Sequence, residues 1–214
     1  MKELITEAVK ELDENKVYKL IENALEVGMA DTEILDCMRL GMDEVGKLFA
    51  NGDYYVADLI MAGYIFKTVL EMIGIYKKQV SDNQAKGRII ICTPFGDFHD
   101  IGKDIFSGMM IAEDYKVFDL GVNVTQSELM SAVKAYKPDI LAFSVTMFNA
   151  VQTVKKMMSD LLREGLRKDI KVILGGAVAD QDLSHVCDID YCTNDIAEGM
   201  MICSEWMEEK NGTK

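Results

Sequence analysis

The sequence is poor in proline, histidine and basic residues. Among 214 residues there are 2 prolines and 2 histidines, and 23 Lys and Arg stand against 36 Asp and Glu, a formal net charge of −13. Such a surface repels phosphate backbones, which excludes nucleic acid as an expected partner. No apolar run approaches the roughly 18 residues that cross a bilayer, and the N-terminus MKELITEAVKELDEN has acids where a signal peptide is apolar. We expect no membrane association and a cytoplasmic protein.

Cysteine and histidine are too sparse for most metal or disulfide frameworks. The five cysteines are odd in number, scattered and without a C-x-x-C pair, which disfavours disulfides and a zinc site and predicts reduced core thiols. They are Cys37, Cys92, Cys187, Cys192 and Cys203. His185, between Leu183 and Val186, is predicted to be an ordinary partly buried histidine. His99 is therefore the main candidate for imidazole chemistry.

The first 79 residues have one kind of pattern. They contain no proline, and their apolar residues recur at helical spacing, with breaks near residues 13–15, at Gly28 and at residues 51–53. Four amphipathic helices with short connections predict a four-helix bundle over residues 1–79.

A polar stretch, residues 80–87, then interrupts the periodicity and is predicted to be a linker. Beyond it, over residues 88–214, strand-length apolar runs alternate with amphipathic segments. The expected strands are 88–92, 117–120, 140–143, 172–174 and 190–193. This alternation predicts an α/β domain with a flavodoxin-like or Rossmann-like, doubly wound, five-stranded parallel sheet.

Ligands of such sheets bind outside the carboxyl ends of the strands. The loop expected after the first strand, residues 93–104, places Asp97 two residues before His99. An imidazole beside a carboxylate suits a metal ligand, or a base, with its orienting partner. The same spacing also fits a surface histidine beside a helix-capping aspartate. The position in the first strand-to-helix loop favours the functional interpretation.

Two further strand ends carry suggestive residues. Ser144 is expected to begin the loop after the third strand, and Gly175-Gly176-Ala177 follow the fourth, where adjacent glycines admit a bulky ligand close to the backbone. Each alone also fits a simple turn or cap. Together, Asp97-x-His99-x-x-Gly102, Ser144 and Gly175-Gly176, after a helical segment, resemble the cobalamin-binding module of corrinoid-dependent methyltransferases, including that of methionine synthase.

The resemblance implies a site for cobalamin or a related corrinoid in the base-off, His-on form. His99 would be the lower axial cobalt ligand, Asp97 its hydrogen-bond partner, and the nucleotide tail would lie beside Ser144 and Gly175-Gly176. The cofactor-binding residues implied are Asp97, His99, Asp100, Ile101, Gly102, Ser144, Thr146, Gly175, Gly176 and Ala177. The sequence departs from the family pattern at Thr146, where leucine is usual, and at residues 148–150, Phe-Asn-Ala, where hydroxyl residues are frequent.

By the same resemblance the chain is a methyl carrier. Co(I) would accept a methyl group from a donor presented by a substrate-specific methyltransferase, and a second methyltransferase, dependent on a pterin such as tetrahydrofolate or on a thiol, would take it from methyl-Co(III). A reductive activator would rescue oxidised cobalt. The bundle would be a cap moving on the 80–87 linker, with the region of Phe49, Tyr54, Tyr55 and Met61 near the upper corrin face. Each of these four side chains taken singly also fits ordinary core packing. The chain alone would lack a complete active site.

Two other functions are compatible with parts of this pattern. A cobalamin-dependent sensor would use the same pair of domains, but such proteins carry an output domain that this sequence does not contain. A flavodoxin-like electron carrier or phospho-receiver would share the sheet and leave His99 and the bundle unexplained. A receiver would have an acidic cluster where Thr93-Pro94-Phe95 stands.

Overall fold

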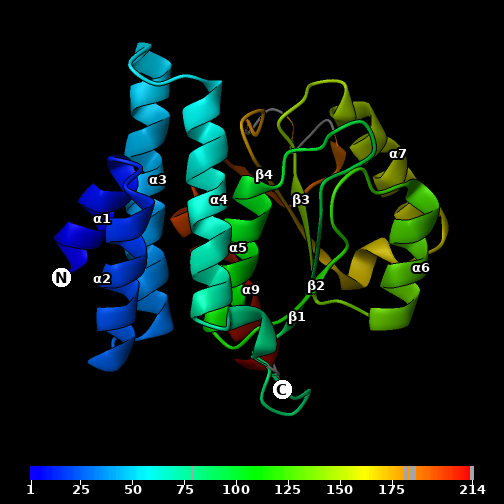
Figure 1. Cartoon of the computed structure of the whole chain (residues 1–214). Coiled ribbons are helices and arrows are strands. Elements are labelled where there is room, and N and C mark those ends of the chain that lie inside the picture. Colours follow the sequence, from blue (N-terminus) through cyan, green and yellow to red (C-terminus); the bar gives the residue numbers. More distant parts are fainter. Residues whose placement is uncertain (79, 181–182, 184–186, 213–214) are drawn as a thin grey trace. The chain divides into compact units, whose positions relative to one another are not determined.

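The chain forms two compact units. The computed structural model describes residues 1–78, 80–180, 183 and 187–212. One unit comprises Met1–Gln79 with Ile111–Glu113, and the other Val80–Met110 with Asp114–Lys214 (Figure 1). None of the helices in the described part of the chain has the length and apolarity needed to cross a bilayer.

The first unit is helical. Its helices are α1 (Lys2–Lys10), α2 (Glu14–Glu26), α3 (Asp31–Asn51) and α4 (Val56–Met72), followed by the 3-10 turn η1 (Ile75–Lys77). Helix starts and stops follow from local chemistry, because Asp13 accepts a hydrogen bond from the Lys16 amide and Gly52 ends α3 with φ +84°. The four predicted helices are present.

Close packing inside this unit depends on a small residue. Gly41 lies where a Cβ atom would come within 2.5 Å of the Val9 Cβ atom, so α1 and α3 pack closely at this point. The Thr6 hydroxyl donates to the Cys37 carbonyl across the same contact, and the Tyr54 hydroxyl donates to the Lys10 carbonyl. Tyr54, expected near the cofactor, thus has a structural hydrogen bond, whereas Tyr55 and Met61 are exposed.

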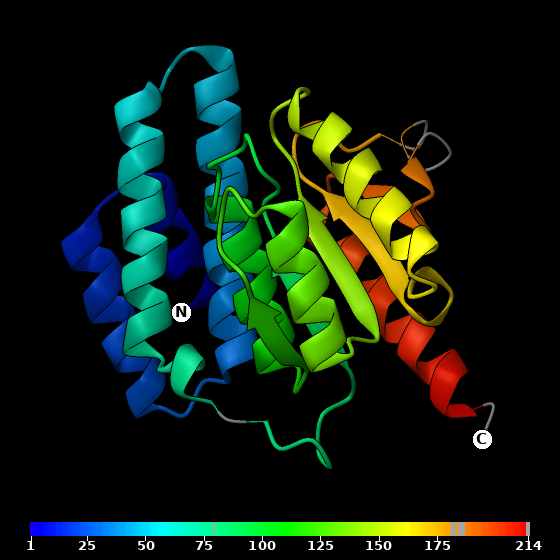
Figure 2. The same ribbon diagram turned by 90° about the vertical axis from the view of Figure 1, so that its right-hand side faces the viewer.

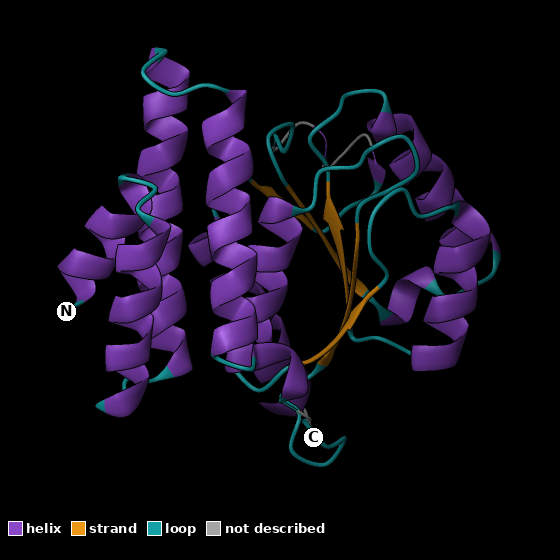
Figure 3. Ribbon diagram, in the orientation of Figure 1, coloured by secondary structure: helices purple, strands orange, loops and turns teal. Residues whose placement is uncertain are grey.

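The second unit is built on a five-stranded parallel sheet (Figure 3). Its strands are β1 (Arg88–Cys92), β2 (Lys116–Asp119), β3 (Ile140–Ser144), β4 (Lys171–Gly175) and β5 (Tyr191–Thr193), in the order β2-β1-β3-β4-β5. Between them lie the helices α5 (Ile101–Ala112), α6 (Gln126–Tyr136), α7 (Ala150–Arg163) and, at the end, α9 (Ile196–Gly212), with η2 (Arg167–Asp169) before β4. This is the predicted doubly wound fold in the flavodoxin-like strand order.

Each face of the sheet has its own apolar core, as expected for strands covered by helices on both faces (Figure 2). Ile90, Leu141 and Val172 pack with residues of α6 and α7, whereas the alternate residues Ile89 and Ile140 pack with residues of α5 and α9. Because β1 lies between β2 and β3, the connections leave β1 and β3 in opposite directions, and the two strand ends form the switch point where ligands bind.

Several boundary predictions were wrong, because the strands expected at 117–120, 172–174 and 190–193 are 116–119, 171–175 and 191–193. Ser144 and Gly175, expected in loops, are the last residues of β3 and β4 and face each other in register. The first loop ends at Asp100, not Asp104, since α5 begins at Ile101 and the Asp104 amide donates to the Asp100 carbonyl. Apolar runs alone predict where strands lie, but strand ends are set by hydrogen bonds to a neighbouring strand.

The predicted 80–87 linker lies within the second unit. Its backbone turns at Ser81, whose carbonyl accepts from the Gln84 and Ala85 amides, and the Lys86 amide donates to the Asp114 carbonyl. Asp82 pairs with Lys116 of β2 at 2.8 Å. These bonds attach the segment to the sheet.

Candidate functional site

The centre of the site is the pair formed by Asp97 and His99 in the loop after β1. The His99 Nδ1 atom lies 2.7 Å from Asp97 Oδ1, and the same oxygen accepts from the His99 amide at 3.1 Å. The Asp97 side chain is fully buried, whereas 58% of the His99 side chain is exposed. The carboxylate therefore fixes the ring through Nδ1, and Nε2 is the ring nitrogen left for a ligand.

The other Asp97 oxygen joins this loop to the loop after β3. Asp97 Oδ2 accepts from the amides of Thr146 at 2.7 Å and Met147 at 2.9 Å. Burial raises the pKa of Asp97, but the hydrogen bonds from the His99 ring and from these amides outweigh it, and the pKa lies below its usual value. Asp97 is thus an ionised bridge between two loops at the switch point. The helix-cap interpretation of Asp97 is replaced by this role.

The loop after β2 supports the His99 loop from the other side. The Asn123 side chain accepts from the Gly96 amide at 3.0 Å, and the Asn123 amide donates to the Asp97 carbonyl. The Thr93 hydroxyl donates to the His99 carbonyl at 2.9 Å. Sequence reasoning did not identify Asn123, although it follows a strand whose carboxyl end was predictable.

Of the two adjacent glycines, one is sterically required. Gly176 has φ +107°, and a Cβ atom there would lie 2.4 Å from the Val145 carbonyl oxygen. A Cβ on Gly175 would find its nearest neighbour, the Thr193 carbonyl oxygen, at 3.6 Å, an ordinary contact. Gly176 thus lets the chain leave β4 directly against the loop after β3.

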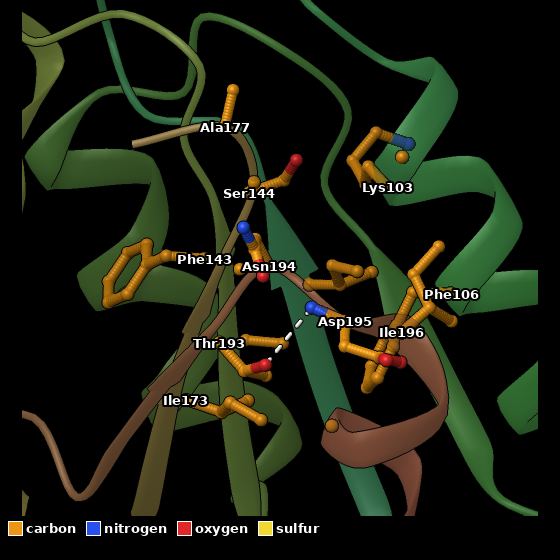
Figure 4. Close-up of a pocket in the computed structure, with 16 residues that line it drawn as sticks. Lys103, Phe106, Phe143, Ser144, Ile173, Ala177, Thr193, Asn194, Asp195 and Ile196 are labelled. Atoms are coloured by element: carbon orange, nitrogen blue, oxygen red, sulfur yellow. Dashed lines mark hydrogen bonds between the residues drawn. The ribbon is translucent and has the colours of Figure 1, made fainter. Parts of the chain in front are cut away.

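A cavity of about 190 Å³ lies at the carboxyl ends of β1, β3, β4 and β5 (Figure 4). Its lining is largely apolar and includes the buried Ile91 and Ile173, the half-buried Phe106 and Gly199 of α9. Lys103 and Thr193 are buried polar residues of the lining. Ser144, Ala177 and Asn194 lie at or just beyond the carboxyl ends of β3, β4 and β5.

The structure brings most of the predicted residues into these two neighbouring groups. Gly102, Ser144, Gly175, Gly176 and Ala177 line the cavity, whereas Asp97, His99 and Thr146 form the hydrogen-bonded cluster beside it. Asp100 and Ile101 connect the two at the start of α5. Thr146, expected in the tail pocket, takes part through its amide, and the cavity lining formed by the described residues does not include it. His185 lies outside the described residues.

Several cavity residues were missed by the sequence analysis. Lys103, Phe106, Thr193, Asn194, Asp195 and Gly199 line it. The carboxyl end of β5 was predictable from the same rule that identified the other loops. The run that forms β5 is short and weakly apolar, so it gives little sign that site residues come after it.

Lys103 is a buried cation near the cavity. Its ammonium group lies 2.6 Å from an Asp104 oxygen and 2.5 Å from an Asp119 oxygen at the end of β2. Burial lowers the pKa of Lys103, but the hydrogen bonds and charges of Asp104 and Asp119 more than compensate, and the pKa is raised. Lys103 therefore stays charged and ties α5 to β2.

Comparison with known proteins shows the family to which the chain belongs. The B12 binding domain family matches residues 87–198, and a second B12 binding domain family matches residues 1–73. The chain belongs to the family of B12-binding corrinoid proteins. Trimethylamine corrinoid protein 1 of Methanosarcina acetivorans is 31% identical over 178 residues, covering 82% of this chain and 82% of that protein.

Among the solved structures that resemble this chain, two match along almost its whole length. A cobalamin-binding protein from Desulfitobacterium hafniense matches with 30% identity and a TM-score of 0.63, over 96% of this chain and 98% of that one. The methanol:cobalamin methyltransferase complex MtaBC from Methanosarcina barkeri matches with 25% identity and a TM-score of 0.55, over 95% of this chain and 78% of that one.

The residues present fit a corrinoid. The imidazole of His99 is oriented and exposed, as a metal-ligating histidine must be. Gly176, which lets the chain leaving β4 pack against the loop after β3, lines a largely apolar cavity at the same edge of the sheet. The family and these features together identify a corrinoid-binding protein.

Proposed function

We propose that this chain is the corrinoid-bearing methyl carrier of a methyltransferase system, with its cofactor bound base-off and His-on. The observation that carries this is the His99 Nδ1 to Asp97 Oδ1 contact of 2.7 Å, with Asp97 buried and held by two amides. When bound, the corrinoid supplies the cobalt that accepts and releases the methyl group. His99 would be its lower axial ligand.

The protein's own residues orient and bind. Asp97 holds the His99 ring in one tautomer, with the proton on Nδ1, and so leaves Nε2 available to bind the cobalt. The cavity beyond Gly175 and Gly176 would take the nucleotide tail that leaves the cobalt when His99 binds. Asp97 accepts from the His99 ring and from backbone amides, so its partners hold the pair rigid without a hydroxyl group from residues 148–150.

The carrier role requires partner enzymes. The similar MtaBC assembly is by its title a complex with a methyltransferase, and the relatives named for trimethylamine point to methylated amines as donors to test. For this chain the proposed partners are a substrate-specific methyltransferase, a second methyltransferase that uses a pterin or a thiol, and a reductive activator. The chain would be the subunit that carries the methyl group, because the partner enzymes have to supply the substrate site.

The ligand assignment is tested by replacing His99. Apo-protein reconstituted with hydroxocobalamin should give a base-off, His-on absorption spectrum, and His99→Ala should change both that spectrum and the electron paramagnetic resonance of the Co(II) form. His185→Ala is the matched control and should change neither. Unchanged spectra in His99→Ala would disprove the ligand assignment.

The carrier role is tested with the same preparation. The reduced holo-protein should gain a methyl group from trimethylamine or methanol only when the matching methyltransferase is added. Methylation of the cofactor by the donor alone would argue against a carrier that depends on partner enzymes. Failure of every tested combination of donor and enzyme to methylate the cofactor would argue against a carrier as well.

A further inference from the structure

Among the described residues, the buried polar side chains that line the cavity already have hydrogen-bond partners within the protein. Thr193 is its buried hydroxyl residue, and its Oγ1 atom donates to Glu198 and accepts from the Asp195 amide at 3.0 Å. The other Glu198 oxygen accepts from the Tyr191 hydroxyl at 2.9 Å. The side chains of Thr193, Glu198 and Tyr191 therefore bond to one another and not to a ligand.

The charged residues of the cavity wall are engaged as well. One Asp195 oxygen accepts from the amides of Ala197 and Glu198, at 2.8 and 3.2 Å, at the start of α9. Lys103 is held between two carboxylates. Among the described lining residues, Ser144, Asn194 and the second Asp195 oxygen remain as polar side-chain groups, and all of them lie on residues that are exposed or half-buried.

Corrinoids differ mainly in the base at the end of the nucleotide tail, so an apolar pocket end discriminates among them. A phenolic ring buries almost no polar atom, a dimethylbenzimidazole buries a ring nitrogen, and an adenine buries several ring nitrogens and an amino group. A buried polar group without a partner costs about 1–3 kcal/mol. We infer that this cavity selects corrinoids by their lower base, and binds those with a benzimidazole or phenolic base more tightly than those with a purine.

This inference rests on the proposed function, because it assumes that the nucleotide tail enters the cavity. Its energetic consequence follows from the unpaired groups of the purine. One such group, left without a partner, weakens binding by roughly five- to a hundredfold.

The test compares corrinoids on the full-length apo-protein by isothermal titration calorimetry. The ligands are cresolyl cobamide, cobalamin, adeninyl cobamide and cobinamide, which has no nucleotide tail. We expect the first two to bind most tightly and adeninyl cobamide to bind at least about fivefold more weakly than cobalamin.

The selectivity would be overturned, and the proposed function would stand, if adeninyl cobamide bound as tightly as cobalamin and both bound more tightly than cobinamide. Absence of binding by every corrinoid would overturn both.

Two variants locate the effect in the cavity. A Cβ on Gly199 would sit 3.5 Å from Ile173 and Phe106, so Gly199→Leu is accommodated at its Cβ and fills the cavity beyond. Cobalamin should then bind roughly five- to a hundredfold more weakly while cobinamide is unaffected. The control Gly46→Leu, at an α3 glycine with open space around it, should bind cobalamin as the parent does. Unchanged cobalamin binding in Gly199→Leu would show that the tail lies elsewhere.

The second variant tests polarity and not size. Ile196 lines the cavity at the first turn of α9 and is partly exposed, so Ile196→Gln adds an amide at little cost to folding. The ratio of adeninyl cobamide to cobalamin affinity should rise, because the amide can pair with the purine. An unchanged ratio in a folded variant would count against the inference.

Discussion

One Asp97 oxygen accepts hydrogen bonds from His99, and the other accepts from two backbone amides of the loop after β3. An asparagine side chain has one oxygen and could accept on only one of these sides. In Asp97→Asn, the NH2 group must face either the His99 ring and amide or the amides of Thr146 and Met147. Donor then meets donor on one side, which should destabilise the apo-protein by about 1–3 kcal/mol.

The same change should weaken cofactor binding by about 10- to 100-fold without abolishing it, since His99 loses its orienting partner. Calorimetric titration with cobalamin measures the affinity, and thermal unfolding measures the stability. Asp169→Asn, at an exposed residue of η2, is the control and should change neither. Parental affinity in Asp97→Asn would show that the carboxylate does not tune the histidine.

Gly176 and Gly175 differ in a way that stability measurements can detect. Gly176→Ala places a Cβ atom 2.4 Å from the Val145 carbonyl oxygen at φ +107°, so backbone must move, and we expect a loss of about 2 kcal/mol or more. Gly175→Ala meets no atom closer than 3.6 Å and should stay within about 0.5 kcal/mol. Chemical denaturation of both apo-variants gives the comparison, and equal losses would refute the steric account.

At the scale of elements, Lys103 joins the start of α5 to the end of β2. Lys103→Met should cost about 2–3 kcal/mol of unfolding free energy, because it removes the buried cation that contacts both the buried Asp104 and the partly exposed Asp119. The control is Lys47→Met, which breaks the exposed Lys47–Glu44 pair of α3 and should have a much smaller effect on stability, because both charges are solvated. Similar effects of the two changes in urea titrations would mean that the Lys103 cluster is only a surface pair.

Buried thiols make the stability of the sheet and its covering helix depend on alkaline pH. Burial raises the pKa of Cys192 in β5 and of Cys203 in α9 from 9.0 to about 12. Since the folded state then holds these protons more tightly than the unfolded state, their contribution is complete below pH 9 and is lost as pH rises from 9 toward 12.

The expected loss is about 1.4 kcal/mol per thiol per pH unit in that window. Denaturant unfolding at several pH values gives the slope, and Cys203→Ala should reduce it by one thiol's share whatever its effect on stability at neutral pH. A slope identical to that of the parent would show that Cys203 does not titrate on unfolding.

The elements also show how far a sequence can predict this fold and site. The prediction of β1 is correct because an unbroken apolar run is bounded by Gly87 and by Thr93-Pro94. The predicted ends of β3 and β4 are not, because Ser144 is a strand residue through its pairing with Gly175, and Gly175 through its pairing with Ser144 and with Thr193 of β5. The proximity of Asp97 and His99 follows from their spacing. The bonds from Asp97 to Thr146 and Met147, 49 and 50 residues away, depend on β1 lying beside β3.

In the molecule as a whole, each of the two units has buried apolar residues of its own. Buried apolar residues occur throughout the helical unit, among them Ile21, Met38 and Phe66, while the described residues of the Asp97–His99 cluster and of the cavity all belong to the second unit. A fragment of residues 80–214 keeps both layers around the sheet, so we expect it to fold and to bind cobalamin through His99.

The helical unit should then be needed for protection of the cofactor and not for its binding. A carrier must shield a reactive group between two enzymes and expose it to each, which a separately folded unit can do by moving. We expect methylcobalamin bound to the 80–214 fragment to be photolysed and exchanged with solvent ligands faster than in the full chain, at a similar dissociation constant for cobalamin. Illumination followed by absorbance gives the rate, with free methylcobalamin as the unprotected reference. Equal rates in the fragment and the full chain would mean that residues 1–79 do not cover the cofactor, and that their role lies in binding the partner enzymes.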